Sequence, residues 1–131
     1  MQKLQNNKSI LTLTKKFSFD SAHRLKNHKG KCKNLHGHTY LLEVSITGKV
    51  NKKTGMIIDF SVLKQLVNDL AVEKLDHQYL NDIIKDPTAE NITQWIWDIL
   101  SNPLKKRGVE LYMLKLWETP TSCATLSKFL V

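Results

Sequence analysis

Three histidines occupy positions from which strand alternation would bring them to one face, where their imidazoles could hold a metal ion. His36 and His38 flank Gly37, and in a β-strand residues i and i+2 point the same way, roughly 6–7 Å apart along the chain. His23 ends an earlier alternating segment on its apolar side. Zinc binds histidine nitrogens, and three protein ligands leave one tetrahedral position for water or substrate. The pattern therefore predicts an open zinc site made by His23, His36 and His38.

The sequence leaves other interpretations of these residues open. A single histidine is more often an ordinary hydrogen-bonded side chain than a ligand, and only the convergence of three favours a metal. Cys32, in the polar segment before His36, could be the fourth ligand of a closed Cys-His₃ site. It could equally be a free base or nucleophile beside the metal. His28 stands among lysines and is expected to be solvated, whereas Cys123 has no polar cluster around it and is expected to be a buried, inert thiol.

Two further acidic positions could take part in chemistry. Asp76 directly precedes His77, and an acid can hold an imidazole ready for proton transfer, although adjacent side chains rarely face each other. Such a pair is more often a surface feature at a helix end. Glu118 follows an apolar segment, where a carboxylate is costly unless a ligand donates hydrogen bonds to it or it faces water. The residues alone leave both interpretations of each position open.

Charge narrows the kinds of partner. The chain has 131 residues, with 20 Lys and Arg against 12 Asp and Glu, and its formal net charge of +8 favours an acidic partner. Nucleic acid, an anionic membrane and a phosphorylated small molecule are all candidates, but the lysines are not interleaved with aromatic residues as on a single-strand binding surface. No apolar run approaches the ~18 residues that span a membrane. A polar start and only two cysteines predict a cytoplasmic protein.

Alternating residues predict the strands that carry the three histidines. Residues 10–24 and residues 36–47 both alternate apolar with polar side chains, so each predicts a half-buried strand, and a polar loop with Gly30 joins them. The nearly continuous apolar segment Val109–Glu118 predicts a third strand, and residues 122–129 predict a short fourth one. Residues 1–9 are expected to be flexible.

Two helices are predicted between the second and third strands. The first is expected to take Asp59 or Ser61 as its N-cap. The second follows Thr88 and carries Glu90 in its first turn, and Pro103 and Gly108 are expected to bound its end. The order ββααββ predicts a single α+β domain over the whole chain, in which two helices cover one face of a four-stranded antiparallel sheet.

Six short segments follow one another along the chain. They are Phe19-Asp-Ser-Ala-His-Arg-Leu25, Cys32-Lys-Asn-Leu-His-Gly-His38, Gly55-Met-Ile-Ile-Asp-Phe60, Leu75-Asp-His-Gln-Tyr-Leu-Asn81, Pro87-Thr-Ala-Glu-Asn91 and Trp117-Glu-Thr-Pro-Thr121. In this order they resemble the 6-pyruvoyl-tetrahydropterin synthase superfamily, and most closely its 6-carboxy-5,6,7,8-tetrahydropterin synthases of queuosine biosynthesis. Any one segment is a weak signal, but six in register do not arise readily by chance. The three-residue gap between Cys32 and His36 is similar to the carboxy enzymes, whereas pyruvoyl enzymes typically have a longer one.

This resemblance implies roles for the metal-binding and acid–base groups. The three histidines would bind zinc, and Cys32, Asp76 and His77 would form a catalytic triad, with the cysteine outside the zinc shell. Members of the superfamily adopt the tunnelling fold, in which subunits pair their sheets into a barrel and trimers stack into hexamers with active sites at subunit junctions. Asp76 and His77 would then meet the Cys32 of a neighbouring chain.

The resemblance also implies a substrate. Glu118 would pair with the amino and ring N–H groups of a pterin, and Thr88 and Glu90 would be further substrate-binding residues. The expected reaction converts 7,8-dihydroneopterin triphosphate to 6-carboxytetrahydropterin with release of acetaldehyde and triphosphate, with zinc as Lewis acid. The expected partners are this small molecule and further copies of the chain, with no nucleic acid and no membrane. The alternatives are a 6-pyruvoyl-tetrahydropterin synthase and a non-catalytic, zinc-stabilised module that binds an anionic partner.

Overall fold

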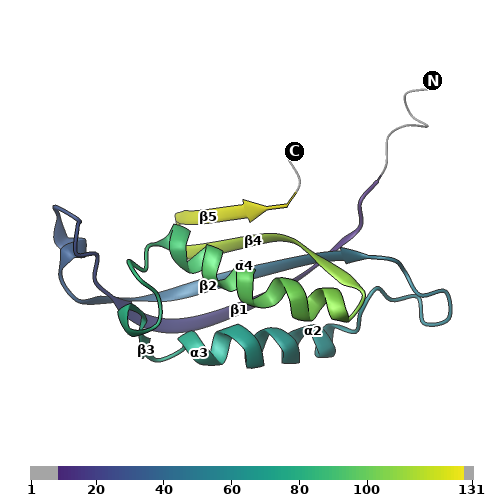
Figure 1. Cartoon of the computed structure of the whole chain (residues 1–131). Coiled ribbons are helices and arrows are strands. Elements are labelled where there is room, and N and C mark those ends of the chain that lie inside the picture. Colours follow the sequence, from purple (N-terminus) through teal and green to yellow (C-terminus); the bar gives the residue numbers. More distant parts are fainter. Residues whose placement is uncertain (1–8, 129–131) are drawn as a thin grey trace, which may run out of the picture.

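A computed structural model describes residues 9–128 of the protein. The segment expected to be flexible lies almost wholly outside these residues, as does the end of the last predicted strand. Five strands form one sheet, and the helices lie together on one of its faces (Figure 1). The elements are β1 (Thr12–His23), β2 (His36–Gly48), α2 (Phe60–Val67), α3 (Glu73–Leu75), β3 (Gln78–Tyr79), α4 (Ala89–Lys106), β4 (Val109–Thr119) and β5 (Ser122–Ser127).

The sheet corrects one prediction. Its order is β3-β1-β2-β4-β5, and β3 runs parallel to β1, so the sheet is five-stranded and mixed, where a four-stranded antiparallel sheet was predicted. The four longer strands pair antiparallel, in agreement with the prediction. β3 contains only two residues, which is too short for alternation to reveal a strand. It forms because the chain after α3 returns to the edge of β1.

The β1–β2 hairpin fixes the position of the histidines. Its register places His23 opposite His36 and Ser21 opposite His38. The inner side chains of both strands are buried, and the rings of Phe19 and Tyr40 stack with their centroids 5.0 Å apart. The buried face of the hairpin therefore leads from these rings to the histidines at its end, with the polar Ser21 between Phe19 and His23.

A β-bulge explains the nearly continuous apolar character of β4. The register against β2 shifts between Ser45 and Ile46, so Ser45 pairs with Met113 while Ile46 pairs with Leu111. An extra residue changes the phase of the alternation. Leu111 before the bulge and Leu114 after it are both buried as a result.

The two long helical segments begin as the sequence predicted. The side chain of Asp59 accepts a hydrogen bond from the backbone N–H of Ser61, and that of Thr88 accepts one from Asn91, so Asp59 and Thr88 are the N-caps of α2 and α4. A π-helical turn, Asn68–Val72, continues α2 into α3.

The end of α4 falls between Pro103 and Gly108, the two residues predicted to bound it. The helix continues through Pro103 and ends at Lys106. Leu100 and Leu104 on either side of this proline are fully buried, and their packing outweighs the one backbone hydrogen bond that proline removes. The chain leaves the helix at Gly108, whose φ of +80° is easily adopted only by glycine.

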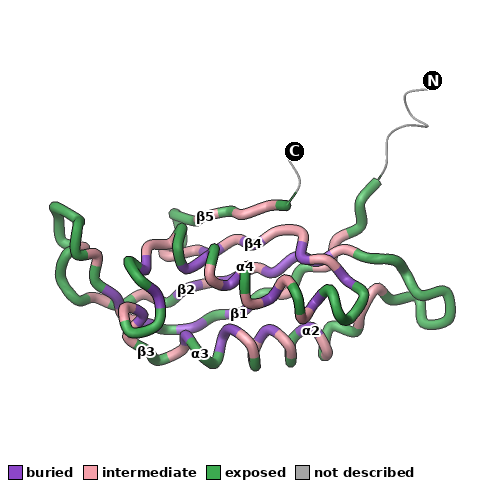
Figure 2. Tube along the Cα trace, viewed as in Figure 1, coloured by how far each residue is buried: buried purple, intermediate pink, exposed green. Residues whose placement is uncertain are grey.

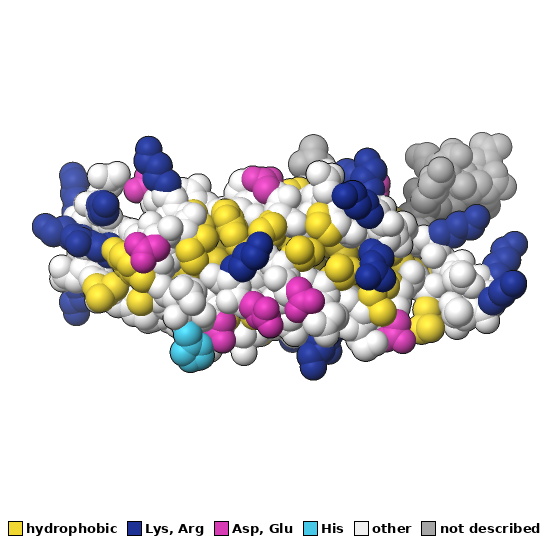
Figure 3. All heavy atoms as spheres, turned by 60° about the horizontal axis from the view of Figure 1, so that its bottom comes forward, with side chains coloured by type: hydrophobic (Ala, Val, Ile, Leu, Met, Phe, Trp, Pro, Cys, Tyr) yellow, Lys and Arg dark blue, Asp and Glu magenta, His cyan; other side chains and the backbone are white. Residues whose placement is uncertain are grey.

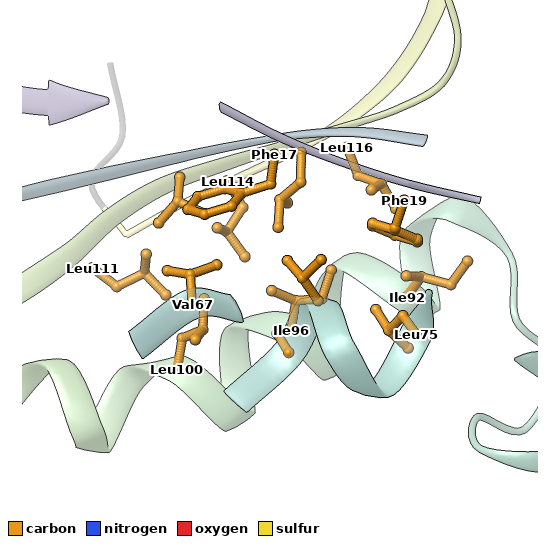
Figure 4. Close-up of a cluster of buried hydrophobic side chains, with 14 of the residues drawn as sticks. Phe17, Phe19, Val67, Leu75, Ile92, Ile96, Leu100, Leu111, Leu114 and Leu116 are labelled. Atoms are coloured by element: carbon orange, nitrogen blue, oxygen red, sulfur yellow. The ribbon is translucent and has the colours of Figure 1, made fainter. Parts of the chain in front are cut away.

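One hydrophobic core joins the sheet to the helices. Side chains from β1 and β4 meet those of α2, α3 and α4, among them Phe17, Leu114, Val67, Leu75 and Ile96 (Figure 4). Figure 2 shows buried residues along the central strands and exposed residues in the loops at both ends. Within residues 9–128 no helix combines the length and apolar character needed to cross a membrane.

The core makes a direct prediction about stability. Ile96 is fully buried, so Ile96→Ala should lower the free energy of unfolding by about 2–5 kcal/mol, through lost burial and the cavity that remains. Urea denaturation measures the change. Ile10→Ala is the matched control, because Ile10 is 55% exposed and its truncation should cost no more than about 0.5 kcal/mol. Equal losses in both variants would contradict this account of the core.

Candidate metal centre and active site

Three imidazoles converge where β1 ends and β2 begins. His23 is fully buried, while His36 and His38 are partly buried. The Nε2 atoms of His23 and His36 are 3.0 Å apart, and the ligand nitrogens of the three histidines all lie within 4.8 Å of one another. The antiparallel register therefore brings together the three residues that the sequence predicted as metal ligands.

Hydrogen bonds orient these nitrogens toward one another. Nδ1 of His23 donates to the carbonyl of Pro87 at 2.8 Å, and Nδ1 of His36 donates to the carbonyl of Asn34 at 2.7 Å. In the neutral rings the facing Nε2 atoms then both carry lone pairs, which repel at 3.0 Å unless a cation lies between them. Nε2 of His38 is buried and has no hydrogen-bond partner among residues 9–128. This set of nitrogen donors fits a metal ion such as zinc.

Burial favours the uncharged form of two of these rings. Desolvation lowers the pKa of His23 below 6.5, opposed in part by its hydrogen bond to Pro87 and by Glu118. Desolvation likewise lowers the pKa of His38, again opposed by Glu118. Nearby Tyr40, whose hydroxyl lies 3.4 Å from Nδ1 of His23, has its pKa raised by burial and so stays a neutral phenol. Neutral imidazole is the form that binds metal, so the fold prepares the site before any ion enters.

Glu118 stands at the edge of the three-histidine cluster. Its Oε1 lies 3.8 Å from Nε2 of His23 and 3.9 Å from Nε2 of His38. The same residue and Glu90 line a hollow of about 300 Å³ between the start of α4 and β5. A ligand held by Glu118 would therefore extend directly toward the three imidazoles.

Thr88 and Cys123 lie around the same end of the sheet. The Thr88 hydroxyl caps α4, so it has limited capacity left for a ligand. Cys123 lines the hollow beside Glu118 and Glu90 and is exposed, so the expectation of a buried thiol was wrong. It fails because β5 is an edge strand whose outer residues are not covered within the described part of the chain.

Asp76 and His77 contact each other directly. The Asp76 carboxylate lies 3.0 Å from Nδ1 of His77, although adjacent side chains rarely meet. The contact is possible because His77 has a φ of +57°, which turns its side chain back toward its neighbour. His77 is 77% exposed, and its side of the sheet forms a hollow of about 550 Å³ that His38 also lines.

Asp20, for which the sequence indicated no role, belongs with this pair. Its backbone N–H donates to Asp76 Oδ1 at 2.9 Å, and its carbonyl accepts from the backbone N–H of His77 at 2.6 Å. Its carboxylate accepts from the Thr39 hydroxyl at 2.5 Å, and it lies within 4.8 Å of the Asp76 and His77 side-chain ligand atoms. Only the parallel pairing of β3 with β1 reveals this group, so no local sequence signal could have found it.

Cys32 lies in a short 3-10 helix, Lys31–Lys33, within the loop between the two histidine-bearing strands. It is partly exposed and is a free thiol. It belongs neither to the three-histidine cluster nor to the Asp20–Asp76–His77 group within residues 9–128. The structure thus brings together the predicted metal ligands with Glu118, and Asp76 with His77, while Cys32 stays apart from both within one chain.

The fold and its histidine cluster define an α+β domain with a candidate metal centre at one end of the sheet. The chain belongs to the 6-pyruvoyl tetrahydropterin synthase family, whose sequence profile matches residues 12–128.

Individual relatives agree with this assignment. The chain is 41% identical to the 6-carboxy-5,6,7,8-tetrahydropterin synthase of a Synechocystis species, over 84% of this chain and 88% of that protein. It is 36% identical to the enzyme of the same name from Haemophilus influenzae, over 86% of this chain and 96% of the relative. The solved structure of Caenorhabditis elegans 6-pyruvoyl tetrahydropterin synthase superposes with a TM-score of 0.75 at 30% identity, covering 92% and 97% of the two chains.

Metal content tests the histidine cluster. His38→Ala should lower bound zinc from about one ion per chain to a small fraction of it, because removing one of three ligands typically weakens such a site strongly. His28→Ala is the matched control, since His28 is exposed in the loop outside the cluster. Elemental analysis of both purified variants after dialysis against zinc measures the effect. Full zinc in His38→Ala would remove this residue from the metal site.

The lowered pKa values predict how the metal-free protein responds to pH. Because the pKa values of His23 and His38 lie below 6.5 in the folded chain, the unfolded chain binds more protons just below pH 6.5. Stability is therefore greatest above pH 6.5 and falls as the pH decreases through the folded pKa values. Urea midpoints of chelator-treated protein at about pH 8 and about pH 5 measure this. The His38→Gln variant should lose less stability between these two pH values than the wild type does. An equal loss would refute the assignment of part of this pH dependence to His38.

Proposed function

We propose that the protein is a zinc-dependent lyase that converts 7,8-dihydroneopterin triphosphate to 6-carboxy-5,6,7,8-tetrahydropterin, acetaldehyde and triphosphate in queuosine biosynthesis. The observation that carries the proposal is the cluster of three imidazoles with a carboxylate within 4 Å of two of them. It occurs in a chain 36–41% identical to proteins named 6-carboxy-5,6,7,8-tetrahydropterin synthase. A site with three protein ligands keeps a position for substrate, as catalytic zinc requires.

In this proposal the chain's own groups hold the pterin beside the metal. Glu118 accepts hydrogen bonds from the amino and ring N–H groups, a charge-assisted arrangement that fixes both the position and the orientation of the ring. Glu90 lines the same hollow as Glu118 and contributes to pterin binding. Thr88 supports the hollow by capping α4. His23, His36 and His38 hold zinc, which when bound supplies Lewis-acid polarisation of the side-chain hydroxyls.

Cys32, Asp76 and His77 carry the proton transfers in this proposal. Asp76 accepts from Nδ1 of His77, which fixes the ring and leaves Nε2 to exchange protons. His77 is largely exposed in a single chain, so a neighbouring subunit would have to cover it to exclude water. We propose a homohexamer in which Cys32 of one chain meets Asp76 and His77 of another, in a reducing cytoplasm where the cysteine remains a thiol.

Replacing the cysteine tests the reaction and separates it from other functions. Cys32→Ala should retain full zinc and lower the rate of acetaldehyde release from dihydroneopterin triphosphate by roughly 10²–10⁴-fold, the range expected for loss of one acid–base group. Coupled detection of acetaldehyde and elemental analysis for zinc are the two measurements.

Other outcomes identify the alternatives. A pyruvoyl pterin formed by the wild-type protein without acetaldehyde would assign 6-pyruvoyl-tetrahydropterin synthase activity. Loss of zinc and of stability in Cys32→Ala, with no turnover by the wild type, would indicate a non-catalytic module in which the cysteine ligates the metal.

Mixing subunits tests the shared active site. Cys32→Ala and His77→Ala homo-oligomers should each be inactive, and hexamers reassembled from both should regain up to about a quarter of the wild-type activity, because some junctions then receive both intact groups. The acetaldehyde assay follows the recovery, and gel filtration follows the assembly. Mixed oligomers without any recovery would place all three groups in one chain.

A further inference from the structure

The loop between β1 and β2 is unusually rich in positive charge. We call residues 24–35 the basic loop, and it contains five cationic residues, Arg24, Lys26, Lys29, Lys31 and Lys33. No Asp or Glu occurs between residues 21 and 42. All five cationic residues are exposed, and none of them forms an ion pair with a carboxylate in the part of the chain that the structure describes.

The basic loop is attached at both ends to the candidate metal centre. It begins directly after His23 and ends directly before His36, whose Nε2 atoms are 3.0 Å apart. A backbone hydrogen bond from Leu25 to Cys32 closes it at 2.8 Å, and Nδ1 of His28 accepts from the N–H of Gly30 at 2.8 Å. It is therefore an internally bonded loop whose two ends lie at the three-histidine cluster.

A hollow accompanies these charges. About 290 Å³ of space lies between the basic loop and the start of α4, lined by Lys26, His28, Asp86 and Thr88 among others. Lys26 and Asp86 are the cation and the carboxylate among its lining residues, and the other four cations of the basic loop lie outside this lining. Figure 3 shows Lys and Arg side chains gathered at both ends of the molecule. The left end is the one at which the basic loop lies in Figure 1.

We propose that the basic loop binds the triphosphate end of the substrate, an inference that rests on the proposed function. Glu118 lies within 4 Å of His23 and His38, whereas the loop continues from His23 and His36. A pterin held at Glu118 extends its side chain across the imidazoles, and its phosphates then reach the loop. Several lysines that form no ion pair within residues 9–128 suit a flexible polyanion, because each ammonium supplies three hydrogen-bond donors.

The molecule contains its own control for this proposal. Lys49, Lys52 and Lys53 form a second basic segment that is likewise exposed and free of acidic residues. It lies after the far end of β2, a strand of 13 residues, which places it about 40 Å from the histidines at roughly 3.3 Å per residue. Replacing these lysines lowers the net charge of the protein as much as replacing lysines of the basic loop. It leaves the electrostatic potential at the candidate site almost unchanged, because salt screens charges that lie more than about 10 Å away at moderate ionic strength.

The test compares two double variants, K26Q/K29Q in the basic loop and K52Q/K53Q at the far end. Lys31 and Lys33 are left intact because they flank Cys32. Titration calorimetry with inorganic triphosphate measures anion binding without turnover, and steady-state kinetics measures KM and kcat for dihydroneopterin triphosphate. K26Q/K29Q should weaken triphosphate binding and raise KM by about tenfold, with kcat within about twofold, if each lost charge contributes about threefold. K52Q/K53Q should match the wild type in both measurements.

Binding of dephosphorylated dihydroneopterin as a competitive inhibitor should be equal in all three proteins. The proposal is overturned if K26Q/K29Q binds inorganic triphosphate as tightly as the wild type, or if K52Q/K53Q loses as much affinity. A wild-type protein that turns over no pterin but binds triphosphate through the loop would reject the proposed function and keep the anion site. Turnover of the pterin by the wild-type protein, together with unchanged triphosphate binding in K26Q/K29Q, would keep the proposed function and reject the anion site.

Discussion

The register of the β1–β2 hairpin is the constraint on which the site depends. Because it pairs His23 with His36, two imidazoles from opposite strands meet, and His38 joins them two residues further along the same face. A slip of one residue would turn His36 and His38 to the other side of the sheet. The large inner side chains along the hairpin, among them Phe19 and Tyr40, hold the register, since any slip would expose them to water.

The site also shows how a polar cluster can end an apolar face. A fully buried imidazole such as that of His23 is costly unless its polar atoms are satisfied. The Pro87 carbonyl, just before α4, satisfies one nitrogen, and the other faces Nε2 of His36 at 3.0 Å, where a bound cation would remove the repulsion between the two lone pairs. The segment that leads into α4 thus supports the three-histidine cluster through the Pro87 carbonyl.

Several features near the site could not be obtained from sequence patterns. The two-residue strand β3 has no alternation of its own, and it forms only because the segment after α3 meets the edge of β1. That meeting brings Asp20 to Asp76 and His77, which are 56 and 57 residues away in sequence. The contact between Asp76 and His77 needs a positive φ at His77, and the exposure of Cys123 follows from the edge position of β5. Each depends on long-range geometry, whereas periodicity reports only local burial.

The sequence by itself determined the four long strands, the start of one helix near Asp59 and of another after Thr88, and the face on which His23, His36 and His38 lie. Alternation and capping are local properties, so the residues encode them directly. The tertiary structure alone decided the fifth strand, the continuation of α4 past Pro103, the grouping of Glu118 with two histidines, and the separation of Cys32 from both clusters within one chain. These depend on which distant surfaces pack together, because a side chain's neighbours across a fold are set by the packing of whole elements.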